Sequence, residues 1–323
     1  AGVDLSLFND KFTATVDYFH EQRDGIYMER KYLPGIVGVN SNPKANVGSV
    51  RSKGFDGNFA YKQKIGKVNL TVRGNFTYSK NEILEKDEMN AVYPYQKEAG
   101  YRVNQAKGLI ALGLFKDYDD IRNSPQQTNW GKVQPGDIKY RDISGPNGVP
   151  DGVIDDNDKV VFGDRDPHFT YSFKGQIGWK GIDFSFYLQG VGKVNGYLSD
   201  EARHCFINDY SVPKVEHLDR WTPTNTDATY PRLYQSQTHN LLFSDYWMED
   251  ASYLRLKNVQ IGYSFPKKLL SKIKFETLRV YFSADNLLTF SNYFGAYDPE
   301  VRSTSGDAYP QVKTYTFGLT TTF

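Results

Sequence analysis

The chain closes with the stretch TYTFGLTTTF, residues 314–323. In an extended strand, Tyr315, Phe317, Leu319 and Phe323 lie on one face, while Gly318 and most of the threonines lie on the other. A free chain end is usually polar and frayed, yet this stretch keeps one apolar face to its last residue. The alternation predicts a half-buried strand. Its ten residues are within the length that a tilted strand needs to cross a membrane, about 9–11 residues.

The same alternation recurs along most of the chain. It is clearest in four further segments: KVNLTVRGNFTYS (67–79), HFTYSFKGQIGW (168–179), IDFSFYLQG (182–190) and LRVYFSAD (278–285). In YLRLKNVQIGYSF (253–265) the apolar parity changes, which predicts a β-bulge near Lys257 or Asn258. The pattern predicts about nine strands of about ten residues or more, which is longer than the usual five or six.

The connections between these segments alternate in length. Short connections are expected at residues 8–10, 64–67 and 179–183, with a slightly longer one at 264–277. Long connections are expected at about 29–45, 83–166, 197–250 and 291–309. Unstructured loops of that length are rare in compact domains. Short turns at one end and long loops at the other are typical of an up-and-down barrel in an outer membrane.

Composition excludes several other classes. With 39 Lys and Arg against 38 Asp and Glu, the chain gives no electrostatic reason to expect nucleic acid as a partner. Its one cysteine, Cys205, excludes an internal disulfide. The mean hydropathy of −0.59 does not separate a soluble protein from a membrane barrel, because half of each barrel strand faces a wet lumen.

A soluble β-sandwich is the main alternative, since its strands also alternate between core and solvent. The long strands, the aromatic residues at strand ends and the alternating connections favour the barrel. An odd number of strands would leave open edges, which lipid does not tolerate. The expected fold is therefore all-β, a transmembrane antiparallel up-and-down barrel of which residues 1–323 form the C-terminal portion. Earlier strands of the barrel would lie outside this sequence.

Several segments resemble one family. They are WTPTNTDATYPRL (221–233), ASYLRLKNVQIGYSFP (251–266), VYFSADNLLTFSNYFGAYDPE (280–300) and YPQVKTYTFGLTTTF (309–323). Together they look like the C-terminal third of a SusC/RagA-type TonB-dependent outer-membrane transporter. PGDIKYRDISG followed by DGVIDDNDKVVFG, within 135–163, is similar to an extracellular insertion of the same family.

The resemblance implies a 22-stranded barrel with long extracellular loops in the outer membrane of a Gram-negative bacterium. It implies an N-terminal plug that is pulled by the TonB complex, and a SusD-like surface lipoprotein that covers the loops. The substrate would be an oligosaccharide or peptide. In barrels of this kind the final aromatic strand is an assembly signal, which here would comprise Tyr315, Phe317, Leu319 and Phe323.

The acidic stretch DGVIDDNDK resembles half of a calcium loop. Aligned on Gly152, it places Asp151, Asp155 and Asp158 at ligand positions, with Asp142 as a displaced first ligand. The alternative is a solvated acidic turn. Calcium is the only cofactor that the sequence suggests.

Aromatic residues in the long loops are candidates for contact with a substrate or a lid protein. They are Trp130, Trp221, Trp247 and Tyr230. Flat rings stack on sugars or anchor peptide side chains, but they also pack loops against one another. On the strands, polar residues such as Lys174, Asp183 and Arg279 are expected to line the lumen.

No pairing of a nucleophile with a base is evident. His204 and Cys205 are adjacent, but adjacency alone does not form a catalytic dyad. Three hypotheses remain: a TonB-dependent importer, a structural or adhesive outer-membrane barrel, and an enzyme with its active site in the loops. The expected function is import and not catalysis.

Overall fold

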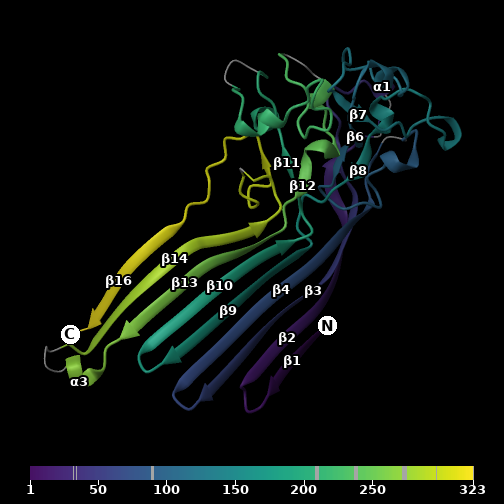
Figure 1. Cartoon of the computed structure of the whole chain (residues 1–323). Coiled ribbons are helices and arrows are strands. Elements are labelled where there is room, and N and C mark those ends of the chain that lie inside the picture. Colours follow the sequence, from purple (N-terminus) through teal and green to yellow (C-terminus); the bar gives the residue numbers. More distant parts are fainter. Residues whose placement is uncertain are drawn as a thin grey trace.

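A single large antiparallel sheet dominates the computed structural model (Figure 1). The structure describes residues 1–323 except 32, 34, 89–90, 208–210, 236–238, 271–274, 296 and 323. Over these residues the sheet has nine strands in the order β1-β2-β3-β4-β9-β10-β13-β14-β16. The order of the strands in this sheet follows their order in the chain, as in an up-and-down topology.

The strands of this sheet are β1 (Gly2–Leu7), β2 (Phe12–Glu29), β3 (Lys44–Ile65), β4 (Val68–Glu85), β9 (Phe169–Trp179), β10 (Ile182–Gly192), β13 (Tyr253–Ser264), β14 (Thr277–Ser291) and β16 (Thr314–Thr322). The smaller strands are β5 (Ala106–Gly108), β6 (Ala111–Leu114), β7 (Ile138–Tyr140), β8 (Val160–Phe162), β11 (Asn195–Leu198), β12 (Met248–Asp250) and β15 (Ser303–Thr304). The α-helices are α1 (Tyr118–Arg122), α2 (Asp200–Arg203) and α3 (Lys267–Leu270).

Seven short 3-10 helices are present in the described residues: η1 (Gly35–Val37), η2 (Pro94–Gln96), η3 (Pro146–Gly148), η4 (Asp156–Asp158), η5 (Val215–Asp219), η6 (His239–Leu241) and η7 (Asp245–Trp247). In the part of the chain that the structure describes, no helix combines the length and the apolar character that a membrane crossing requires.

The connections alternate in length between the two ends of the sheet (Figure 1). At the lower end in Figure 1, short connections join β1 to β2, β3 to β4, β9 to β10 and, through α3, β13 to β14. At the other end, long segments follow β2, β4, β10 and β14, and those after β4, β10 and β14 carry the smaller strands and most of the short helices. We call these four long segments the loop layer.

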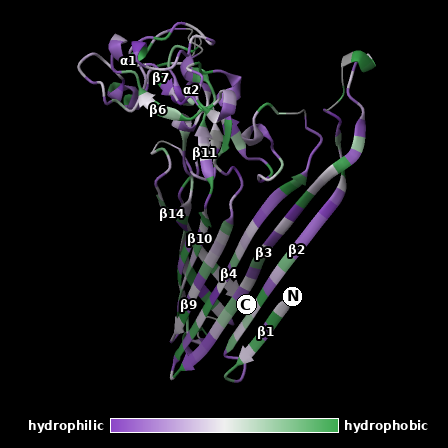
Figure 2. Ribbon diagram, turned by 90° about the vertical axis from the view of Figure 1, so that its right-hand side faces the viewer, coloured by the Kyte–Doolittle hydropathy of each residue, from purple (hydrophilic) through white to green (hydrophobic). Residues whose placement is uncertain are grey.

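The sheet has one apolar face and one polar face, because the strand pairing keeps like residues in rows. One row across six strands contains Leu70, Ile177, Phe184, Ile261, Phe282 and Phe317. The next row contains Thr71, Gln176, Ser185, Gln260, Ser283 and Thr316. Figure 2 shows the resulting alternation of hydrophobic and hydrophilic residues along the strands.

The apolar face is uncovered by any other part of the described chain. Ile261 is 49% exposed and Phe317 is 83% exposed. Monomeric soluble proteins rarely leave a continuous apolar surface of this kind in water, so the face requires an apolar environment or a partner. This argues against the soluble sandwich, in which a second sheet would cover it.

The predicted bulge is confirmed on β13. Leu256 pairs with Leu188 of β10 and Asn258 pairs with Tyr187, so Lys257 is an extra residue of β13. The pairing of β13 with β14 also shifts at Lys257. One extra residue thus reverses the parity of β13 and restores its apolar side chains to the common face.

The last strand pairs with β14, and its exposed residues join the apolar face. Tyr315, Phe317 and Leu319 lie opposite Ala284, Phe282 and Val280. All three are exposed. Phe323, the fourth member of the predicted assembly signal, lies outside the described residues.

Candidate functional site

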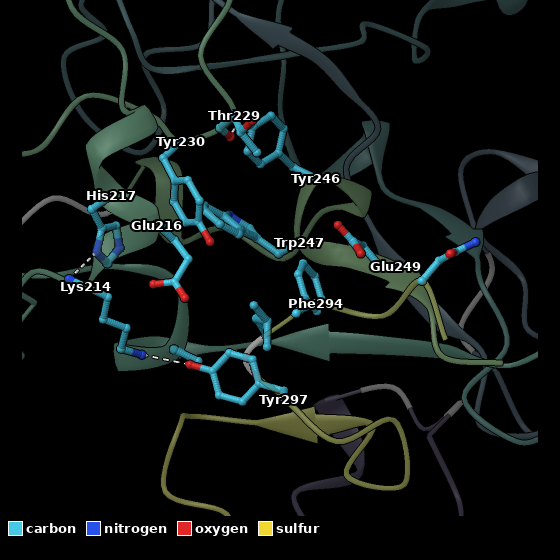
Figure 3. Close-up of a pocket in the computed structure, with 14 residues that line it drawn as sticks. Lys214, Glu216, His217, Thr229, Tyr230, Tyr246, Trp247, Glu249, Phe294 and Tyr297 are labelled. Atoms are coloured by element: carbon cyan, nitrogen blue, oxygen red, sulfur yellow. Dashed lines mark hydrogen bonds between the residues drawn. The ribbon is translucent and has the colours of Figure 1, made fainter. Parts of the chain in front are cut away.

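The loop layer has its own core, and a pocket lies against it. The core cluster consists of Leu109, Ile138, Tyr140, Ile154, Tyr197 and Trp247. Beside Trp247 the structure forms a cavity of about 410 Å³ (Figure 3). Its walls come from the end of β11 with α2, from Lys214 with η5, from residues 229–230 with residues 246–249, and from residues 292–295 with Tyr297 after β14. Four segments distant in sequence therefore meet around one space.

Five aromatic side chains are part of the lining. Trp247 is 3% exposed and donates its indole N–H to the Asn240 carbonyl oxygen at 3.2 Å. The rings of Tyr230 and Tyr246 pack on it, with centroids at 5.9 and 5.1 Å. Phe294 and Tyr297 face this cluster from the segment after β14 (Figure 3). Tilted and edge-on aromatic pairs of this kind make a well-packed surface.

A buried arginine outside the pocket lining packs against Trp247. The Arg203 guanidinium lies 5.8 Å from the Trp247 ring centroid and 5.5 Å from that of Tyr197. It donates to the Tyr197 hydroxyl and to the Leu241 carbonyl oxygen, each at 2.6 Å. Arg203 is 4% exposed and is not among the residues that line the pocket. Its contacts hold the aromatic wall in place.

Lys214 closes one side of the pocket. Its ammonium group donates to the Tyr297 hydroxyl at 2.8 Å (Figure 3). It also donates to the Glu201 carbonyl oxygen at 2.9 Å. Its backbone N–H donates to Nδ1 of His217 at 2.9 Å. Nε2 of His217 is 3.2 Å from the Arg203 carbonyl oxygen, so the ring is neutral and its proton is on Nε2. Burial, with a smaller contribution from Lys214, lowers the pKa of His217.

Two carboxylates also face the pocket. Glu216 belongs to η5 and Glu249 to β12, and Figure 3 shows them on opposite sides of the space between the rings. Partial burial raises the pKa of Glu249. The pKa of Tyr230 rises to about 12, chiefly through burial and secondarily through the charges of Glu216, Tyr297 and Glu249. The negative charges of both carboxylates therefore raise the pKa of the same group, the Tyr230 hydroxyl.

An ion cluster attaches one wall of the pocket to the sheet. Arg255 on β13 is completely buried. Its Nη2 donates to both carboxylate oxygens of Asp298 at 2.8 and 2.7 Å, and its Nη1 lies 3.0 Å from Oε1 of Glu300. Asp298 directly follows Tyr297, so this cluster fixes the position of the wall that carries Phe294 and Tyr297.

Of the four aromatic residues that the sequence singled out, two line the pocket and two do not. Tyr230 and Trp247 line the pocket. Trp130 packs against the core of the loop layer, with the Lys159 ammonium 6.0 Å from its ring centroid. Trp221 packs on Gly136, where an added Cβ would lie 2.6 Å from the indole ring. Contact with a substrate or a lid stays a prediction for all four.

The acidic loop is tied together by hydrogen bonds to backbone N–H groups. Asp158 is fully buried and accepts from the N–H groups of Ile143, Ser144 and Asp155 at 2.7, 2.8 and 2.7 Å. Asp142 accepts from Gly152 at 2.7 Å. Among the described residues no group of three or more His, Cys, Asp or Glu side chains is arranged to hold a metal ion. Calcium binding stays a prediction from the sequence.

His204 and Cys205 do not form a nucleophile and base pair. Nε2 of His204 lies 3.1 Å from the Asn240 carbonyl oxygen, and its ring packs edge-on against Trp247. Cys205 is buried, and burial raises the pKa of its thiol. A protonated thiol is a weak nucleophile. Both residues contribute to the packing of the loop layer.

Sequence reasoning missed the charged residues of the pocket. Lys214, Glu216 and Glu249 stand in no motif and show no common spacing. Phe294 and Tyr297 lie in the segment 280–300, which carried the family resemblance, but nothing local distinguished them from packing residues. Only the fold brings these side chains together.

No protein-family model matches the chain. Curated relatives do match over its whole length. TonB-dependent receptor P3 of Formosa agariphila is 27% identical over 354 residues, covering 100% of this chain and 33% of the relative. TonB-dependent receptor SusC of Bacteroides thetaiotaomicron is 25% identical over 338 residues, covering 100% of this chain and 31% of the relative. The chain is homologous to the SusC-type TonB-dependent receptors.

Solved structures show the same fold. The RagAB peptide transporter matches with a TM-score of 0.76 and 23% identity, covering 100% of this chain and 34% of that one. The RagAB peptide importer in its open-open state matches with a TM-score of 0.75 and 22% identity. The nine-stranded sheet thus has the fold of a portion of a transmembrane antiparallel β-barrel. The chain spans about a third of the length of the curated relatives it matches.

Proposed function

We propose that this chain forms wall and outer loops of an outer-membrane importer of a Gram-negative bacterium, driven by TonB. The observation that carries the proposal is the match of the whole chain to TonB-dependent receptors, together with a sheet that is apolar on one face and polar on the other. The apolar face would contact lipid, and the polar face would line the lumen.

The cargo would be an oligosaccharide or a peptide. A peptide is supported by the RagAB structures, which are described as a peptide importer and transporter. An aromatic pocket of about 410 Å³ in the loop layer fits either cargo. The partners would be a SusD-like lipoprotein over the loops and the TonB complex acting through a plug domain elsewhere in the protein.

The physical steps follow from this arrangement. Cargo would bind among the loops and be enclosed by the lipoprotein. TonB would pull on the plug with energy from the inner membrane, and a path would open along the polar face. The chain's own contribution is a rigid wall and a preformed pocket. The similar proteins are receptors and importers, which favours transport over a loop-borne hydrolase.

The test uses the full-length protein in its own cells. Uptake of labelled peptide and labelled oligosaccharide mixtures is measured in the parent, in a deletion strain and in a strain that lacks TonB. We expect one of the two mixtures to enter only when both the protein and TonB are present. Equal uptake of both mixtures in all three strains would contradict import and favour a structural or adhesive barrel.

A further inference from the structure

Two carboxylates of the pocket, those of Glu216 and Glu249, have no ion-pair partner in the described part of the chain. Among the described residues, no Lys, Arg or His side chain forms an ion pair with Glu216 or Glu249. Lys214 also lines the pocket, but its ammonium group donates to the neutral Tyr297 hydroxyl and Glu201 carbonyl oxygen and to neither carboxylate. His217 is neutral in its hydrogen-bonded state.

Glu249 also loses part of its hydration without gaining a cationic partner. Burial is the one cause that raises the pKa of Glu249, so no nearby cation offsets its desolvation. Glu216 acts with Glu249 on the same tyrosine, Tyr230. A partly desolvated carboxylate that lacks a cation is stabilised when a positively charged ligand enters.

The aromatic rings complete a site for such a ligand. Cations are attracted to the faces of tryptophan, tyrosine and phenylalanine when they lie within about 6 Å of the ring centroid. Tyr230, Tyr246, Phe294 and Tyr297 surround the space between the two carboxylates (Figure 3). Aliphatic stems of Lys or Arg pack well against the same rings.

We propose that this pocket binds a lysine or arginine side chain of a peptide cargo, held between Glu216 and Glu249 and packed on the aromatic wall. The inference rests on the proposed import function and deepens it by naming the cargo class. A neutral oligosaccharide would use the rings but would leave both carboxylates without a positive partner. The geometry points to a basic peptide for that reason.

Binding to the purified full-length transporter tests the proposal without requiring transport. The first probe is a hexapeptide with blocked termini and one central lysine, so that the side chain is its only cation. The second probe is the same peptide with Nε-acetyllysine, and the third is maltohexaose. Isothermal titration is done at low and at high salt. We expect the lysine peptide to bind about 10-fold more tightly than the acetylated one, with the difference shrinking at high salt.

Single charge removals identify the site. Glu216→Gln and Glu249→Gln should each weaken the binding of the lysine peptide by about 3-fold to 10-fold and leave the binding of the acetylated peptide unchanged. Asp227→Asn is the matched control, because Asp227 is an exposed carboxylate of the same loop layer outside the pocket. It should change neither affinity.

Several results would overturn the inference while leaving the import function intact. The lysine and acetyllysine peptides could bind equally, or maltohexaose could bind as tightly as the lysine peptide. The glutamate variants could instead weaken binding of the lid lipoprotein and leave the peptide unaffected, which would make the pocket a protein contact. Failure of import itself would appear separately, as uptake that does not depend on TonB.

Discussion

Arg279 on β14 reaches across β13 to Asp183 on β10. Nε and Nη2 of the guanidinium donate to Oδ1 and Oδ2 of the carboxylate at 3.1 and 2.6 Å. Gly262 of β13 lies beneath the crossing, and a Cβ there would meet Nη2 of Arg279 at 2.4 Å and Oδ1 of Asp183 at 2.8 Å. One bidentate pair thus joins three strands on the polar face of the sheet.

This relationship predicts that Gly262→Ala destabilises the barrel by displacing the Arg279 side chain. The pair is partly exposed, with side chains 28% and 42% accessible, so its contribution is about 0.2–1 kcal/mol. We expect a small decrease in the thermal midpoint of the full-length barrel in detergent. Gly178→Ala is the control, because Gly178 faces Asp183 from β9 and has only the Cβ of Asn69 nearby, at 4.0 Å.

A double mutant separates the pair from other effects of the added methyl group. In an Arg279→Gln background, Gly262→Ala should lower the thermal midpoint less than it does in the wild type, because the guanidinium that the methyl group displaces is already absent. Equal costs in both backgrounds would show that the pair does not depend on Gly262.

Arg255 should be far more important for stability than its neighbour Lys257. Arg255→Gln leaves the carboxylates of Asp298 and Glu300 without their buried cation, and breaking a buried pair costs about 3–5 kcal/mol. Lys257 is 3.7 Å from Glu300 and partly exposed, so Lys257→Gln should cost well under 1 kcal/mol, about the value of a surface pair.

Limited proteolysis of the full-length protein measures the difference. Cleavage within residues 292–313 should rise strongly in Arg255→Gln and hardly at all in Lys257→Gln. Adding Asp298→Asn to Arg255→Gln should restore part of the protection. Identical cleavage in both single variants would contradict the role given to this cluster.

His204 should make the loop layer less stable in acid. Burial, and next the charge of Arg203, lowers its pKa from 6.5 to about 3. The unfolded chain therefore takes up a proton as the pH falls below about 6.5, while the folded loop layer does not until about pH 3. Between pH 7.5 and 5.5 this difference lowers the free energy of unfolding of the loop layer by about 1 kcal/mol.

Hydrogen exchange of the loop layer at the two pH values provides the measurement, after correction for the intrinsic rate. His204→Gln should reduce the loss of protection at pH 5.5, because glutamine does not titrate in this range. His20→Gln, at an exposed position on β2, should leave the loss unchanged. A loss that is the same in all three proteins would exclude His204 as its source.

Asp158 should hold the acidic loop through its hydrogen bonds. Asp158→Asn removes acceptor capacity from a fully buried side chain that serves three N–H groups. An unsatisfied buried donor costs about 1–3 kcal/mol. Exchange of the N–H groups of Ile143 and Ser144 should therefore accelerate. Unchanged exchange would contradict this role.

The calcium prediction is tested on the same loop. If calcium binds, its addition to the wild type should protect residues 142–158 and EGTA should reverse the effect, while Asp151→Asn should abolish it. Protection that is insensitive to calcium and to EGTA would contradict the prediction and leave the hydrogen bonds as the complete explanation of the loop.

The sheet was predictable because its information is local. A residue's face follows from the parity of its position, so the rows through Phe184 and Ser185 can be read from single segments. Even the bulge at Lys257 left a local mark, as a change of parity. The pocket has no such mark. Glu216 and Glu249 meet Phe294 only after two long connections have folded, and their lack of an ion-pair partner cannot be seen until every neighbour is placed.

Peptide uptake by cells that express the full-length protein tests most directly whether the pocket selects basic peptides for import. The double variant Glu216→Gln/Glu249→Gln is compared with the control variant Asp227→Asn. Peptides remaining in the medium are identified by mass spectrometry, with and without TonB. We expect the medium to lose peptides with lysine or arginine preferentially, and only when TonB is present. Only the double glutamate variant should lose this preference. Depletion without TonB, or the same preference in both variants, would contradict it.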